Sequence, residues 1–185
     1  MLSGALPPPT GIQHKGRGKL NVGDQLSEKR LLSALEKKGL ISFAQARDFY
    51  GNRFELIKQF ERRRVKQGGN DYDENRDKPF ILIDAMVALN LKRKDDPSKT
   101  LDEDTIFQTL AESWGIPFAK IDPLKLDLNV VTTTIPISFA KNHLVLPVEV
   151  SQGKLTVATP NPFNLDVFED ITRACQMQVH AVVSP

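Results

Sequence analysis

The residues that could carry out chemistry in this sequence are few and widely spaced. The three histidines are His14, His143 and His180, and no acid–base pairing can be read from their positions. Cys175 is the single cysteine, which excludes a disulfide within the chain. Its place on the apolar face of an expected helix indicates a small buried side chain rather than a reactive thiol. No Cys/His cluster has zinc-site spacing, and no Gly-x-Ser-x-Gly nucleophile elbow occurs. We therefore expect no catalytic residue and no metal site.

Phosphate binding is also not encoded in the usual way. The two Gly-Lys pairs, Gly18-Lys19 and Gly153-Lys154, are each followed by leucine, which cannot supply the hydroxyl that binds magnesium in a phosphate-binding loop. We therefore predict that this chain is not itself an enzyme, does not hydrolyse ATP and carries no cofactor.

The basic run Arg62, Arg63, Arg64 and Lys66, interrupted only by Val65, allows two interpretations. It can be the solvated face of a helix, or a patch that binds an anion or a partner protein through forked guanidinium hydrogen bonds. No evident row of aromatic residues accompanies it, so we expect no nucleic-acid partner.

Charge divides the chain into two parts. Residues 1–100 hold 20 Lys and Arg against 13 acids, a net charge of +7, whereas residues 101–185 hold 5 against 10, a net charge of −5. Such asymmetry indicates regions with different partners. A protein that binds nucleic acid over its whole surface would be basic throughout.

Composition and periodicity predict three segments. Residues 1–23 include Pro7-Pro8-Pro9 and five glycines, a composition typical of a disordered leader. Residues 24–114 have helical spacing of apolar residues and form a helical subdomain, with loops at about 68–78 and 93–100. Residues 115–185 form an α/β subdomain. The predicted fold class is therefore α+β, a helical N-terminal half followed by a small α/β subdomain.

Local signals set the expected helix ends. A first helix starts near Asp24 or Ser27 and ends at Gly39. Ser42 and Gln45 have capping-box spacing and open a short helix, which Gly51-Asn52 should break.

Further along the chain, Thr100 and Glu103 show the capping-box spacing again, and Gly115 should close the helix that follows. Trp114, next to that glycine, is expected in a core or an interface.

The C-terminal subdomain should contain about three strands. A short helix is expected at 135–143, followed by strands at 144–150 and 154–159. The turn between these strands, Ser151-Gln152-Gly153, has a glycine for positive φ and predicts a β-hairpin. A helix at 164–175 and a strand at 178–183 then complete a β-α-β crossover with parallel strands.

Residues 112–185 resemble the N-terminal domain shared by type II secretion ATPases (general secretory pathway protein E) and type IV pilus assembly ATPases. The matching motifs occur in the family's order: Gly115-Ile116-Pro117-Phe118, Ile135-Pro136 with Ala140, Leu146-Pro147, Leu155-Thr156-Val157-Ala158 and Asn161-Pro162. The family usually has aspartate at the position of Asn161.

The resemblance implies a docking domain. Such a domain binds the cytoplasmic domain of an inner-membrane partner and tethers the ATPase motor to the secretion or pilus machine. It implies a cytoplasmic protein that contacts the membrane only through that partner, with ATP and magnesium bound only by a downstream motor domain.

The resemblance also implies an alternative function, binding of cyclic di-GMP through a motif in the helical half. A first copy of that motif would start at Arg30 and Leu31 and include Leu35, Gly39, Leu40 and Ile41. Arg30 would supply the cation for guanine or phosphate, and the leucines and isoleucine an apolar floor. Leu32, Glu36 and Arg53 depart from the motif, and a second copy at 81–113 keeps little of it. These losses favour protein docking over nucleotide sensing.

Overall fold

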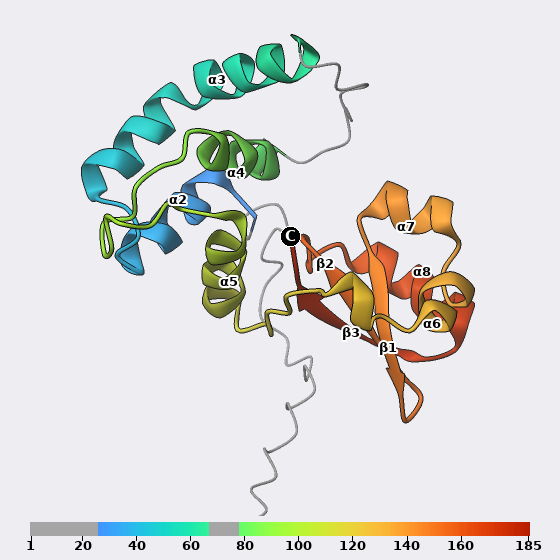
Figure 1. The fold of residues 1–185 in the computed structure, drawn as a ribbon. Coiled ribbons are helices and arrows are strands. Elements are labelled where there is room, and N and C mark those ends of the chain that lie inside the picture. Colours follow the sequence, from blue (N-terminus) through green and yellow to red (C-terminus); the bar gives the residue numbers. More distant parts are fainter. Residues whose placement is uncertain (1–25, 67–77) are drawn as a thin grey trace, which may run out of the picture.

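The computed structural model describes residues 26–66 and 78–185, which form two lobes (Figure 1). The predicted leader at 1–23 and nearly all of the predicted loop at 68–78 lie outside the described residues. The helical lobe comprises α2 (Glu28–Lys37), α3 (Phe43–Lys66), α4 (Lys78–Ala88) and α5 (Glu103–Trp114). The other lobe comprises η1 (Pro123–Lys125), α6 (Leu128–Thr133), α7 (Ile137–His143), β1 (Leu146–Ser151), β2 (Lys154–Thr159), α8 (Leu165–Cys175) and β3 (Gln178–Val183). The predicted α+β class is confirmed.

Helix α2 begins and ends where the sequence predicts. The Ser27 side chain accepts a hydrogen bond from the backbone N–H of Arg30, at 3.3 Å, and so satisfies a donor that the helix leaves free. Gly39 follows the last turn with φ of +79°, a conformation that glycine adopts without steric penalty.

Helix α3 is a single helix, so the predicted break at Gly51-Asn52 is wrong. Its start is as predicted, because Ser42 and Gln45 exchange two hydrogen bonds, of 2.8 and 3.1 Å, in a capping box. A glycine inside a helix costs only about 1 kcal/mol relative to alanine. Phe49, two residues before Gly51, lies in the helical core, and Leu56, five residues after it, packs against that core; such burial outweighs that penalty.

Helix α5 starts from a different residue than predicted. Asp102, not Thr100, is the N-cap, and its Oδ1 accepts from the backbone N–H of Thr105 at 2.7 Å. The predicted capping box of Thr100 and Glu103 is therefore wrong. Thr100 pairs with Lys92 in an isolated antiparallel bridge that closes the predicted loop, so its backbone remains extended. Gly115 ends α5 as predicted, with φ of +68°.

The sheet has the order β1-β2-β3. Strands β1 and β2 form the predicted hairpin, and Gln152 and Gly153 in its turn both have positive φ, at +52° and +73°. This combination is the type I′ turn, whose twist matches that of the strands. Helix α8 then leads to β3, which pairs in parallel with β2 from Lys154↔Gln178 to Thr159↔Val183. The predicted parallel crossover is therefore confirmed.

Two apolar clusters hold the described residues together. One fills the helical lobe and contains 0–3% exposed side chains such as Leu35, Leu82, Met86 and Ile106. The other lies between the sheet and its helices: Ile135, Val145, Leu155, Val157, Val167 and Ile171. Val183, at the end of β3, belongs to the first cluster, so the sheet reaches into the helical core.

Candidate functional site

An apolar groove lies where the two lobes meet, with a volume of about 440 Å³. Helix α5, helix α7, the adjoining ends of β1 and β2, and the last residues of the chain all contribute to its lining. Glu103 and Lys141 are charged residues of this lining; most of the others are apolar, including Phe107, Ile121, Val131, Ile137, Ala140, Leu144, Val145, Leu146, Pro147 and Ala158. A cavity of this size and character takes an apolar side chain or a small ligand.

The chain turns sharply at the rim of this groove. Leu144 follows α7 with φ of +51°, which is unusual for a residue other than glycine, and its side chain is 42% exposed. Its backbone N–H and that of Val145 both donate to the carbonyl of Ala140. This turn directs the chain into β1 and leaves an apolar side chain at the edge of the groove.

Contacts between the lobes fix the groove walls. The Trp114 ring meets the Phe163 ring edge-on, with centroids 5.1 Å apart, so this tryptophan is an interface residue as expected. Phe118 forms a bridge with Val183, flanked by backbone hydrogen bonds of 2.8 and 2.9 Å. Lys120 pairs with Asp104 of α5, and that carboxylate raises the pKa of Lys120. These contacts between the lobes therefore hold the walls of the groove in position.

The six residues proposed for cyclic di-GMP lie close together on α2 and the turn after it. Leu31, Leu35, Leu40 and Ile41 are 0–3% exposed and belong to the helical core, so in this conformation they do not offer a surface to a ligand. Arg30 is exposed on α2, and Gly39 keeps positive φ. The assignment to cyclic di-GMP stays a prediction.

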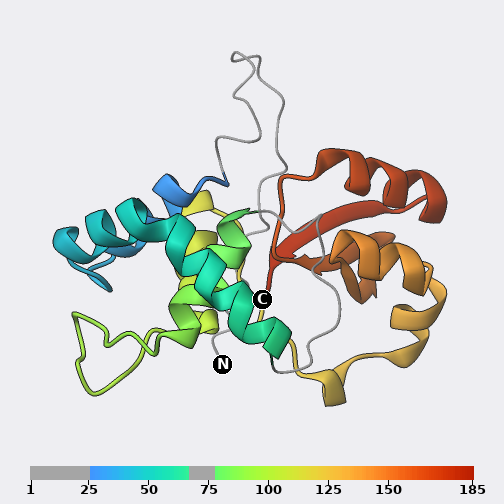
Figure 2. The same ribbon diagram turned by 90° about the horizontal axis from the view of Figure 1, so that it is seen from above.

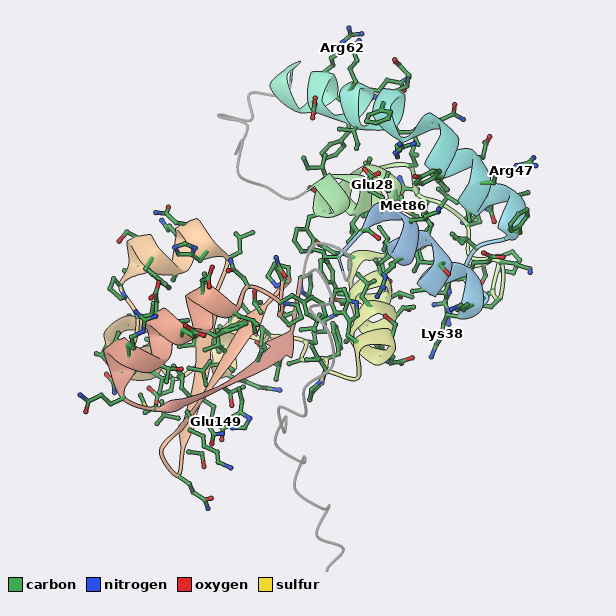
Figure 3. The ribbon with its side chains drawn as sticks, turned by 180° about the vertical axis from the view of Figure 1, so that it is seen from behind. Glu28, Lys38, Arg47, Arg62, Met86 and Glu149 are labelled. Carbon is green, nitrogen blue, oxygen red and sulfur yellow. The ribbon has the colours of Figure 1, made fainter. Side chains whose placement is uncertain are left out.

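The basic run lies at the C-terminal end of α3. Arg62 and Arg63 are exposed, and Figure 3 shows Arg62 pointing away from the body of the protein. The side chains of Arg64 and Lys66 lie outside the described residues. The proposed role of this run in partner binding stays a prediction.

The structure reveals a surface that the sequence analysis missed, on the outward side of α3. Phe43, Tyr50 and Phe54 stand 7 and 4 residues apart and are 67%, 38% and 62% exposed. Arg47 and Lys58 share this side at helical spacing and are also exposed. We call these five residues the aromatic face of α3. Only a continuous helix brings these five residues onto one side. The helix break wrongly predicted at Gly51-Asn52 is therefore the reason that the sequence analysis missed this surface.

The ionisable residues that the structure describes also bear on whether the chain could hold a metal ion. Within residues 26–66 and 78–185, no group of three or more His, Cys, Asp or Glu side chains could hold a metal ion. Cys175 is partly buried and donates to the carbonyl of Ile171, and burial raises the pKa of its thiol above the ordinary value. None of the described helices is long and apolar enough to cross a membrane.

Comparison with known proteins identifies the class of the C-terminal part. Residues 114–185 match the family model of the MshEN domain. The resemblance to the N-terminal domain of secretion and pilus-assembly ATPases is thereby confirmed. A relative, the type IV pilus assembly ATPase TfpB of Acinetobacter baylyi, is 36% identical over 81 residues. That stretch covers 44% of this chain and 14% of TfpB, so the present chain matches only a small part of its relative.

Two solved structures are among the partial structural matches to this chain. MshE with cdg is 19% identical with a TM-score of 0.49, over 84% of this chain and 90% of that one. The N-terminal domain of XpsE is 17% identical with a TM-score of 0.45, over 84% of this chain and 85% of that one. Both TM-scores lie below 0.5, so neither likeness bears on the function.

Proposed function

We propose that this chain is the N-terminal docking domain of a secretion or pilus-assembly ATPase. The observation that carries the proposal is the MshEN match over residues 114–185, supported by the 36% identity to part of a pilus assembly ATPase. In this proposal a downstream motor domain binds ATP and magnesium, and the present chain is not catalytic. The chain's two Gly-Lys pairs lack the following hydroxyl residue, which agrees with that division of labour.

The proposed partner is the cytoplasmic domain of an inner-membrane protein of the same machine. The parent protein would then be cytoplasmic and reach the membrane only through this partner. The net charge of +7 over residues 1–100 favours an acidic partner surface. Complementary charge speeds association and orients the two proteins, and salt weakens it.

Titration of the 185-residue chain with the cytoplasmic domain of that inner-membrane protein tests the proposal. We expect binding at low salt that weakens as salt is added. Absence of association at low salt would refute docking.

A second candidate is sensing of cyclic di-GMP. It is favoured by the exposed Arg30 and by Gly39, whose positive φ would let backbone N–H groups approach a phosphate. The burial of the proposed apolar floor opposes it, because the helical core would have to open. Calorimetry and thermal melting with cyclic di-GMP decide the matter, since a ligand that binds the folded state must raise its melting temperature.

A further inference from the structure

The aromatic face of α3 is unusual for the outward side of a helix in a globular lobe. Such a side normally carries polar residues, whereas here Phe43 and Phe54 are each more than 60% exposed. Helix α3 packs on α2 and α4, and it lies on the outside of the helical lobe, away from the sheet (Figures 1 and 2). No described residue covers its outer side. Clustered exposed aromatic residues mark binding surfaces.

Arg53 holds two of the rings in place. Its guanidinium carbon lies 4.2 Å from the centroid of the Tyr50 ring and 4.3 Å from that of Phe54. Its Nε lies 2.9 Å from Oε2 of Glu28, and both side chains are mostly buried, at 20% and 17% exposure. The rings are thus positioned before any partner arrives, which reduces the side-chain entropy lost on binding.

The charges on the aromatic face indicate what it binds. Arg47 and Lys58 are exposed between and beyond the rings and have no ion-pair partner among the residues that the structure describes. Figure 3 shows Arg47 extending away from the protein. Asp48 and Glu55 lie on the adjoining side of the helix rather than between the rings, and the partly buried Glu61 follows the face one turn beyond Lys58. Aromatic rings alternating with cations complement a surface on which carboxylates alternate with large apolar groups.

The N-terminal segment of the chain lacks the negative charge that would complement the aromatic face of α3. Residues 1–25 hold three Lys and Arg against one Asp, so their charge has the same sign as that of the face. Residues 67–77 hold four acids against one Arg and have a suitable sign, which makes them a rival that the test must distinguish.

We infer that the aromatic face of α3, and not the basic run at 62–66, is where this domain binds its partner, and that the partner contributes an acidic amphipathic segment. This inference rests on the proposed docking function. The aromatic rings supply the contact area, and Arg47 and Lys58 orient the partner's carboxylates.

Three variants of the 185-residue chain test the inference against the cytoplasmic domain of the inner-membrane protein. The double variant Phe43→Gln/Phe54→Gln should weaken binding by at least about 30-fold, the usual effect of losing a hot-spot residue. Arg47→Glu should slow association and reduce its salt dependence. The matched control is Leu165→Gln, which changes a side chain of similar exposure, 56%, on α8 and should bind as the wild type does. Circular dichroism verifies that each variant is folded.

The outcomes separate the inference from the proposed function. Equal binding by wild type and the α3 variants would overturn the inference and leave docking intact. If the wild type does not bind the partner domain, the proposed docking function is refuted. The specificity of the aromatic face is then tested by itself with a defined probe. That probe is a synthetic helical peptide in which turns that carry Glu alternate with turns that carry Leu. Its control is the same peptide with Lys in place of each Glu. NMR shift changes at residues 43–58 with the acidic peptide only would support the acidic, apolar specificity of the face, and their absence would overturn it.

Other occupants give different results. If changing the four acids of 67–77 to amides shifts the signals of residues 43–58, the chain covers its own aromatic face. Self-association that Phe43→Gln/Phe54→Gln abolishes would assign the face to a second copy. Binding of a single-stranded oligonucleotide that the same variant abolishes would assign it to nucleic acid. Each of these results would overturn the inference.

Discussion

Replacing Gly51 with alanine tests whether α3 is continuous. Gly51 is exposed within the helix, and a Cβ added there meets no atom within 4 Å. Alanine at an unstrained helix position stabilises by about 1 kcal/mol relative to glycine, through lower backbone entropy in the unfolded chain. For a protein of this size we expect Gly51→Ala to raise the melting temperature by roughly 2–4 °C.

Gly115→Ala is the matched control for this substitution. A Cβ at Gly115 also meets no atom within 4 Å, but its φ of +68° is unfavourable for alanine by about 1–2 kcal/mol. We therefore expect Gly51→Ala to raise, and Gly115→Ala to lower, the midpoint of urea unfolding followed by circular dichroism. A midpoint for Gly51→Ala at or below that of the wild type would show that residue 51 does not lie inside a helix. It would also remove the basis for the aromatic face of α3.

Three further substitutions, together with one exposed control position, probe the caps and the core. Ser42→Ala removes half of the capping box and should reduce the free energy of unfolding by about 1 kcal/mol, measured with urea. Leu35→Ala, at a fully buried position, should reduce it by about 2–5 kcal/mol, whereas Leu165→Ala at an exposed position should change it by less than about 0.5 kcal/mol. Hydrogen bonds from Thr105 hold the pKa of Asp102 below its ordinary value. The carboxylate therefore stabilises the fold above about pH 4, and this contribution is lost as the pH falls through the folded-state pKa. Asp102→Asn, which keeps an oxygen for the cap, should lose less stability than the wild type between about pH 5 and pH 2; equal losses would contradict this role of the charge.

Features fixed by a few neighbouring residues could be predicted from the sequence. The capping box of Ser42 and Gln45 needs only a polar pair three residues apart, and the hairpin turn involves only the two neighbouring residues Gln152 and Gly153. In both, the backbone groups that must be satisfied lie within the same short segment. Local chemistry therefore decides them whatever the rest of the chain does.

Features that depend on packing could not be predicted in this way. Gly51 is a local signal for a break, but the anchoring of Phe49 and Leu56 in the core overrides it. Asp102 and Thr100 both suit a helix start, and the choice is made by the pairing of Thr100 with Lys92. The groove between the lobes joins residues from 103 to 185, so no single stretch of sequence indicates it.

The bridge between Phe118 and Val183 brings the two ends of the α/β lobe to one place. The segment by which the chain enters this lobe therefore lies beside the end of its last strand. The backbone N–H of Ala119 donates a hydrogen bond to the carbonyl of Val183 and joins the two. A lobe whose ends meet can be inserted, exchanged or circularly permuted as a unit without disturbing its sheet. In mechanical terms, a pull applied across those ends would load this short pairing first and would leave the β1–β2 hairpin and α8 out of the line of force.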